Sequence, residues 1–186
     1  MALLLTLITL VAMTLAGIGM MRSVDTGMLV AGNLAFKQSA IHAGDRGINA
    51  GYQWLLSQAG TGALNMTNPA VGYFSARPPV EPNWADALTW AGAPSPVVDA
   101  ATGNSTTYLI HRMCTQQNTA YNGTNAGVPN ECMVSLDSAA SGTGGSMAVG
   151  SVVFQGSPQL YYRITTRTAG PRNSISYTQA VVMIGE

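Results

Sequence analysis

The chain opens with an uninterrupted apolar segment. Residues 1–21 (MALLLTLITLVAMTLAGIGMM) carry no charged side chain, and the first charge is at Arg22. A helix of this length extends about 31 Å, enough to cross the roughly 30 Å hydrocarbon core of a bilayer. A cleaved secretory signal would instead need a basic segment before a shorter apolar core. Nothing basic precedes this segment, so we predict a retained membrane helix with Met1 as the mature terminus left by removal of a short leader.

A second apolar pattern continues the helical character beyond the apolar segment. No proline occurs over 22–57, and apolar residues recur at spacings of three, four and seven, at Leu34, Ile41, Ile48, Tyr52 and Leu55. These spacings keep the series on one helical face. We therefore predict one helix of about 55 residues, with a membrane half over 1–21 and an amphipathic half over 22–57 that packs on a folded domain. The seven glycines between 17 and 51 weaken this helix and permit close approach of a neighbouring helix.

The rest of the chain has strand patterns after an irregular start. Five prolines between 78 and 96 exclude a long helix, so 58–107 is predicted to be an irregular connection with a short helical turn at Trp84, Leu88 and Trp90. After this connection we predict strands at 107–114, 131–136 and 148–154, a flexible turn at 138–145, and a hairpin formed by 160–168 and 174–184, so that 108–186 forms a sheet with a disulfide loop. The expected fold is α+β: a long N-terminal helix packed on a C-terminal antiparallel sheet of four or five strands.

The amino-acid composition narrows the possible classes of function. Charged residues make up only 9% of the chain, and eight basic side chains balance eight acidic ones. No basic patch is large enough to neutralise a run of phosphates, so no nucleic acid partner is expected. Uncharged polar residues must therefore supply the solubility of the folded domain, as in many exported surface proteins.

Cys114 and Cys132 predict a disulfide, because an even pair of cysteines in an exported chain is normally oxidised. Such a bond contributes about 3 kcal/mol by loop-entropy arguments. One alternative is a zinc site that adds His111 and either Glu131 or Asp137. Another is a calcium site in the enclosed loop, which has too few carboxylates for a typical one. The simplest interpretation of this Asn- and Gly-rich segment is a stapled surface loop.

Catalytic patterns are weak throughout the sequence. The two histidines, His42 and His111, fall on the long helix and on a strand. The eight acidic residues show no paired spacing of the glycosidase kind, and no serine lies in a G-x-S-x-G motif. We therefore expect no enzyme activity, no catalytic residue, no cofactor and no bound metal.

The order of these features resembles the type IV pilin superfamily, and more specifically the PilX-type minor pilins. The neutral apolar terminus is similar to theirs, and the helix signature M-x-x-AGN-x-x-x-x-x-x-A is matched by Met28, Ala31, Gly32, Asn33 and Ala40. The closing hairpin of the family, with YRIT and a glutamine in the last strand, is matched by 162–165 and Gln179. The resemblance covers about 45 N-terminal and 25 C-terminal residues and leaves the middle unplaced. It implies the type IV pilin fold and makes the loop 115–131 a candidate contact surface.

The resemblance also implies a route of processing and assembly. Prepilin peptidase removes a leader, Met1 becomes N-methylated, and the subunit waits in the inner membrane with its C-terminal domain outside the cytoplasm. An inner-membrane assembly platform then moves it into an extracellular pilus filament at the cell surface. PilX-like subunits prime assembly with other pilin and minor pilin subunits and with the pilus tip adhesin, and they affect aggregation and adhesion. The expected filament-core residues are Leu3, Leu4, Leu5, Leu7, Ile8, Leu10, Val11, Leu15 and Ile18.

One departure from the superfamily bears on the role of the subunit. Most major pilins have a glutamate at the fifth mature position, where this chain has Leu5. The substitution favours a minor pilin at a special position, such as the tip. The alternatives are a repeating pilus subunit or a type II secretion pseudopilin. An alternative from another class is a membrane-anchored periplasmic binding domain that stays in the membrane.

Overall fold

The computed structural model describes residues 1–135 and 158–185. The predicted turn at 138–145 and the predicted strand at 148–154 lie outside these residues. The chain divides into two compact units, 1–39 and 40–186. Helix α1 (Ala2–Gln58) belongs to both units, which confirms the prediction of one long N-terminal helix.

The first unit consists of the apolar part of α1. Its side chains are exposed, and an 18-residue window reaches a mean hydropathy of 2.2, so the helix is long and apolar enough to cross a membrane. The hydroxyls of Thr6, Thr9 and Thr14 each donate to the backbone carbonyl three residues earlier, at 2.9 Å. These bonds satisfy the polar groups inside the helix itself, as a lipid environment requires.

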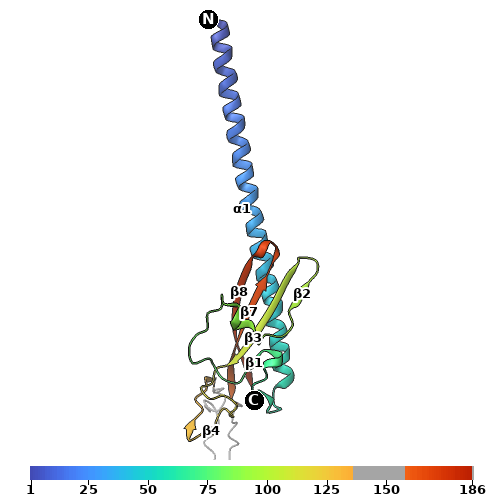
Figure 1. Ribbon diagram of the computed structural model, residues 1–186, viewed down its shortest axis with the longest axis vertical. Helices are drawn as coiled ribbons and strands as arrows, with labels where there is room; N and C mark the ends of the chain where they lie inside the picture. Colours follow the sequence, from blue (N-terminus) through green and yellow to red (C-terminus); the bar gives the residue numbers. More distant parts are fainter. Residues whose placement is uncertain (136–157, 186) are drawn as a thin grey trace, which may run out of the picture. The chain divides into compact units, whose positions relative to one another are not determined.

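The second unit contains a six-stranded sheet, built around the hairpin of β7 (Gln159–Ala169) and β8 (Ile175–Gly185) (Figure 1). The two strands pair along their whole length, from Gln159 opposite Gly185 to Ala169 opposite Ile175. Their connection contains the short helix η5 (Pro171–Asn173). This pairing confirms the predicted C-terminal hairpin.

Four further strands complete the sheet. β3 (Asn104–Arg112) pairs with β7, while β2 (Val97–Asp99) pairs with β3 and β6 (Val134–Ser135) pairs with β7, all antiparallel. The prediction of a wholly antiparallel sheet of four or five strands was wrong in two respects, because the described residues form a sheet of six strands and β1 (Tyr73–Phe74) runs parallel to β3. The long connection over 75–103 makes this parallel pairing possible, since parallel neighbours need a crossover of a dozen or more residues.

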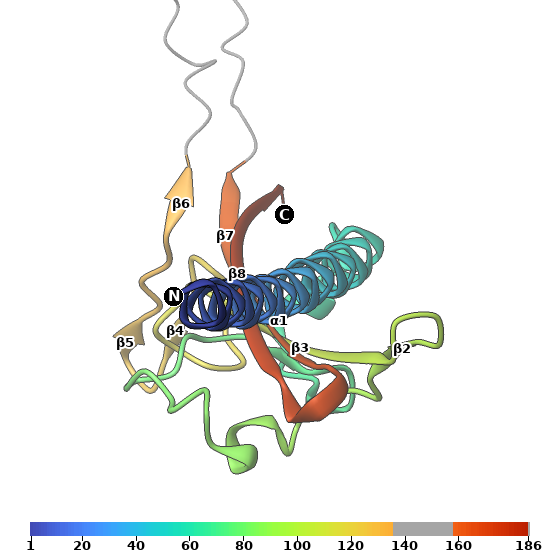
Figure 2. The same ribbon diagram turned by 90° about the horizontal axis from the view of Figure 1, so that it is seen from above.

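The connection over 58–107 is more ordered than the sequence predicted. It contains the short helices η1 (Ala63–Asn65), η2 (Pro69–Val71) and η3 (Ala87–Trp90), together with β1 and β2 and the start of β3. Helix η3 confirms the predicted helical turn, and the rings of Trp84 and Trp90 pack 5.7 Å apart. Leu88 does not join them, because it is 79% exposed. A separate two-stranded hairpin, β4 (Thr124–Asn125) with β5 (Val128–Pro129), lies on the other side of the second unit from β2 (Figure 2).

Small residues form the face of α1 that packs on the sheet. The buried residues of the helix are Ala40, Ala43, Gly44, Gly47, Gly51 and Leu55. A Cβ added at Gly47 would lie 2.6 Å from Cγ2 of Thr106, and one added at Gly44 would lie 2.7 Å from Oγ1 of Thr178. The helix backbone therefore touches the threonines of the sheet, at a distance that only glycine allows.

The predicted helix face was wrong in part for this reason. Of the large apolar residues in the predicted series, Leu55 is buried and Ile48 and Tyr52 are partly buried, but Leu34 and Ile41 are exposed. Small residues, which the apolar pattern did not count, make the close contact. The larger side chains pack at the C-terminal end of the helix, in a core formed by Leu55, Leu64, Tyr73, Ile110, Cys114, Leu160, Tyr162, Ile164 and Ile184.

We expect Gly47→Ala to destabilise the second unit by about 1–2 kcal/mol, because overpacking against Thr106 outweighs the gain of about 1 kcal/mol in helix propensity. Urea unfolding of the full chain in detergent, followed by tryptophan fluorescence, measures this loss. Adding Thr106→Ser removes the methyl group that the new Cβ meets and should restore part of the stability. A single Gly47→Ala variant as stable as the parent would contradict the close contact.

Candidate functional site

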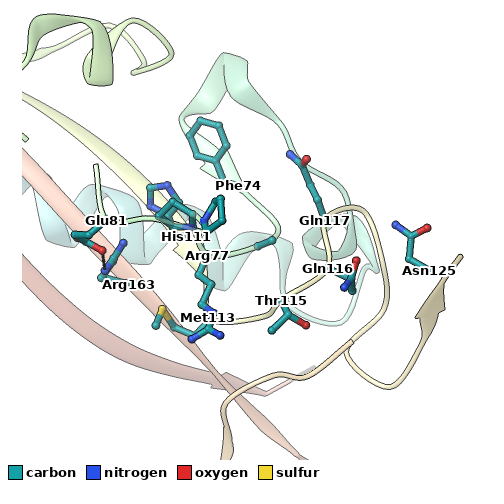
Figure 3. A pocket seen from close by; sticks show the side chains of 13 residues that line it. Phe74, Arg77, Glu81, His111, Met113, Thr115, Gln116, Gln117, Asn125 and Arg163 are labelled. Atoms are coloured by element: carbon teal, nitrogen blue, oxygen red, sulfur yellow. Dashed lines mark hydrogen bonds and ion pairs between the residues drawn. The ribbon is translucent and has the colours of Figure 1, made fainter. Parts of the chain in front are cut away.

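A pocket of about 1020 Å³ opens on the face of the sheet that α1 does not cover. Three parts of the second unit form it (Figure 3). The floor comes from β3 and β7. One wall is the proline-rich segment 76–81, and the other is the loop 115–131 between Cys114 and Cys132, called the disulfide loop below. Figure 3 shows the ion pair of Glu81 and Arg163 on one side of the pocket and Gln116, Gln117 and Asn125 on the other.

The pairing of β3 with β7 brings the two central residues of the floor together. His111 and Arg163 are directly opposite each other in the antiparallel register, so their side chains emerge side by side on one face. On each strand the neighbouring residues Ile110 and Ile164 point to the other face and join the core. The alternation of side chains along the two strands therefore places the guanidinium of Arg163 and the imidazole of His111 beneath the pocket.

Arg163 is held in place by two neighbours. Its Nη1 donates to Oε2 of Glu81 at 2.9 Å, and its guanidinium lies 5.6 Å from the centre of the Trp84 ring. The indole Nε1 of Trp84 donates to the other carboxylate oxygen of Glu81, also at 2.9 Å. Although burial acts to raise it, hydrogen bonds from Arg163 and Trp84 lower the pKa of Glu81 overall. Glu81 is thus charged at neutral pH.

His111 is buried under aromatic rings. Its ring stacks on Phe74 with centroids 5.0 Å apart, and the edge of Trp84 lies 6.2 Å away. Burial, and secondarily the positive charge of Arg163, lowers the pKa of His111 to about 4, against an opposing effect of Glu81. The imidazole is therefore neutral at neutral pH and contributes no charge to the pocket.

The disulfide loop forms the second wall. Cys114 and Cys132 are bonded, with their Cα atoms 4.0 Å apart, which confirms the predicted disulfide. The zinc alternative fails because both sulfurs are consumed in this bond. Residues 1–135 and 158–185 contain no cluster of three or more His, Cys, Asp and Glu side chains that could hold a metal ion.

Arg112 fixes the loop to the domain. The side chain is fully buried and donates through Nε to the carbonyl of Ser75 at 2.9 Å, through Nη1 to Oδ1 of Asn65 at 2.7 Å, and through Nη2 to the carbonyl of Thr119. Asn130 braces the loop internally, since its Nδ2 donates to the carbonyls of Thr119 and Ala120 within the same loop. The guanidinium of Arg112 thereby joins η1, the segment after β1 and the disulfide loop.

The sequence singled out only part of this site. His111, the two cysteines and the loop 115–131 were named, and Arg163 only within the family motif 162–165, whereas Arg112, Glu81 and Phe74 were given no role. A signal for Arg112 was present: in β3 it follows Thr106, Tyr108 and Ile110 on the inward side of the alternation, where a charged residue must find partners. His42, the other histidine, is exposed on α1.

The other residues predicted to be functional lie on α1. The expected filament-core residues are all exposed in the first unit: Leu3, Leu4, Leu5, Leu7, Ile8, Leu10, Val11, Leu15 and Ile18. Of the family-motif residues, Ala40 is buried against the sheet, Met28, Ala31 and Asn33 are exposed, and Gly32 is partly buried. Met1 precedes the first helical residue.

Comparisons with protein-family models, with curated proteins and with solved structures find no match to this chain. The α+β fold and the pocket are therefore described from this chain alone.

We expect the stability of the second unit to decrease as the pH falls from about 6.5 to about 4. In this range an unfolded histidine binds a proton, whereas folded His111 stays neutral until its pKa of about 4 is reached. The loss approaches about 3 kcal/mol at the lower end. Urea unfolding at several pH values measures it, and His111→Phe should flatten this part of the profile. Identical pH profiles for the two proteins would contradict the buried neutral imidazole.

Replacing Arg112 with Met should destabilise the second unit by about 3 kcal/mol, because three acceptors lose a charged donor. Arg167→Met, at a partly exposed position of β7, is the matched control and should change the stability by less than about 0.5 kcal/mol. Urea unfolding of both variants gives the comparison. A loss below about 1 kcal/mol for Arg112→Met would show that the loop is held without this side chain.

Proposed function

We propose that this chain is a structural subunit of a type IV pilus, of the PilX-type minor pilin kind. One observation carries the proposal: the exposed apolar helix and the helix on which the folded domain is built are the same element, α1. A simple membrane anchor needs no such continuity, because a linker can join it to any domain. A filament subunit does need it, since packing of the apolar helices must fix the position of each domain.

The apolar half of α1 supplies the free energy of assembly. Its large side chains are exposed on every side of the helix, so lipid or neighbouring helices must cover them. Exchange of lipid for protein contacts favours close packing of helices, which small residues permit. The space around Gly17, Gly27 and Gly32 is open and leaves room for such neighbours.

Leu5 favours the minor role within the superfamily. Leucine lets the helix sit in lipid without an unpaired buried carboxylate, which is costly. It also removes an ion pair that would set the register of repeating subunits. The subunit accordingly enters the filament near its tip, primes assembly with other minor pilins and the tip adhesin, and contributes to adhesion and aggregation. Prepilin peptidase processes it, Met1 is N-methylated, and the inner-membrane assembly platform transfers it to the cell surface.

A membrane-anchored periplasmic binding domain is the second candidate, and the pocket over His111 and Arg163 is the observation that favours it. Both candidates place the second unit outside the cytoplasm, in agreement with its disulfide. They differ in whether the chain ever leaves the membrane.

Mass spectrometry of sheared surface filaments, from cells with and without prepilin peptidase, tests the proposal. We expect recovery of the chain at low copy with a methylated Met1, and no recovery without the peptidase. Recovery as the dominant species would identify a repeating subunit instead. Absence from the filaments, with all protein in the inner membrane, would contradict the pilus role and leave the pseudopilin and the anchored domain.

Ile8→Asp should abolish incorporation into filaments, because it places a carboxylate in the apolar helix at a cost of about 2.5–3.5 kcal/mol or more. Leu56→Asp is the matched control, since this leucine is 44% exposed on the same helix within the folded unit. Quantitative immunoblots of sheared and cellular fractions measure both variants. Normal incorporation of the Ile8→Asp protein would contradict packing of apolar helices as the basis of assembly.

A further inference from the structure

The floor of the pocket contains polar atoms that have no partner among the described residues. These are Nε and Nη2 of Arg163 and Nδ1 of His111, all three buried. Arg163 is only 13% exposed and His111 only 7%. Buried polar groups in folded proteins are nearly always hydrogen-bonded, so a set of three at one place needs an explanation. A ligand that enters the pocket supplies one once a small shift of the lining side chains opens these atoms, because both residues line the pocket.

The geometry of Arg163 selects the chemistry of that ligand. Glu81 accepts a hydrogen bond from Nη1. The Nε–H and Nη2–H groups then remain as a pair of parallel donors along one edge of the guanidinium. Such an edge matches the two oxygens of a carboxylate in a bidentate arrangement. The Glu81 contact and the Trp84 ring hold the guanidinium in place, so little freedom remains to be lost on binding.

The remaining lining agrees with a hydroxylated ligand of small size. Among the described residues, two arginines and one glutamate line the pocket, and they leave one positive charge in excess because His111 is neutral. Across from Arg163, the wall carries Thr115, Gln116 and Asn125, whose side chains can both donate and accept hydrogen bonds. Figure 3 shows Phe74 above this space, where a ring can cover the apolar face of a sugar.

We propose that this pocket binds a sugar bearing a carboxylate, such as a uronic or sialic acid, with the carboxylate on the Nε and Nη2 edge of Arg163. His111 Nδ1 hydrogen-bonds a hydroxyl beside the carboxylate, and Arg77 adds a second positive charge at the rim. Gln116 and Asn125 bind the hydroxyls on the far side of the ring. This site belongs to the second unit alone, so it does not depend on filament assembly.

Isothermal titration calorimetry on the full chain, in an uncharged polyoxyethylene detergent, tests the site. The probes are glucuronic acid and N-acetylneuraminic acid, with glucose and N-acetylglucosamine as neutral counterparts. We expect at least one acidic sugar to bind at least about tenfold more tightly than its neutral counterpart, because the bidentate charged contact is lost in the latter. Equal binding of neutral and acidic sugars, or no binding of either acid at millimolar concentration, would overturn the proposal.

Further probes separate the carboxylate from the sugar. Acetate, inorganic phosphate and a glutamate-containing tripeptide are titrated under the same conditions. Each should bind at least about tenfold more weakly than the preferred acidic sugar, since none offers both the carboxylate and the ring hydroxyls. Tighter binding of the tripeptide would assign the pocket to an acidic peptide and overturn the sugar assignment. Tighter binding of phosphate would overturn the carboxylate assignment.

Substitutions assign the contact to Arg163. Arg163→Gln should weaken binding of the acidic sugar at least about tenfold, and Arg163→Lys should weaken it as well, because lysine keeps the charge but lacks the paired donors. Arg167→Gln is the matched control, an arginine four residues along the same strand and outside the pocket, and it should bind normally. Full affinity in Arg163→Lys would overturn the bidentate contact.

Two milder variants keep the test decisive if Arg163→Gln does not fold. Arg77 is exposed, and glutamine at position 81 keeps an oxygen that can accept from Arg163, so both variants should remain folded. Glu81→Gln removes a competing anion beside Arg163 and should strengthen binding of the acidic sugar, whereas Arg77→Gln should weaken it. Unchanged affinity in both variants would overturn the proposal.

Discussion

The close contact between the backbone of α1 and a ladder of threonines is the constraint on which the second unit depends. Gly44 and Gly47 face Thr106, Thr166 and Thr178, at distances that exclude any side chain on the helix. Two of these threonine hydroxyls are hydrogen-bonded: that of Thr106 to the hydroxyl of Thr168 at 3.0 Å, and that of Thr166 to the carbonyl of Thr178 at 3.2 Å. A polar sheet surface can therefore pack on a helix, with van der Waals contact rather than large apolar side chains as the main attraction.

Because α1 packs on one face of the sheet, it leaves the opposite face uncovered. Because the helix covers the side of Ile110 and Ile164, the alternate residues His111 and Arg163 emerge on the other side. The segment 76–81 and the disulfide loop then enclose them, and the buried guanidinium of Arg112 joins the loop to Ser75, the residue just before that segment. The pocket is thus a product of strand alternation combined with two irregular segments, each of which is fixed by a specific polar contact.

Elements governed by local pattern could be predicted from the sequence. The long helix, the β7–β8 hairpin and the Cys114–Cys132 bond follow from apolar runs, period-two alternation and cysteine number. The buried face of α1 could not be predicted, because a hydrophobic pattern does not count glycine and alanine, although these residues set the distance between helix and sheet. The pocket could not either, since the ion pair of Glu81 with Arg163 joins residues 82 positions apart and depends on the path of a proline-rich segment.

The disulfide loop is constrained unevenly along its length. Thr119 is buried and bound to Arg112, and Asn130 is buried and bound to the backbone of the loop itself. The residues next to Cys114 line the pocket together with Asn125, so these positions are constrained as well. Residues 126–129 of the hairpin are exposed. Substitutions and insertions can therefore accumulate at 126–129 while the wall of the pocket keeps its shape.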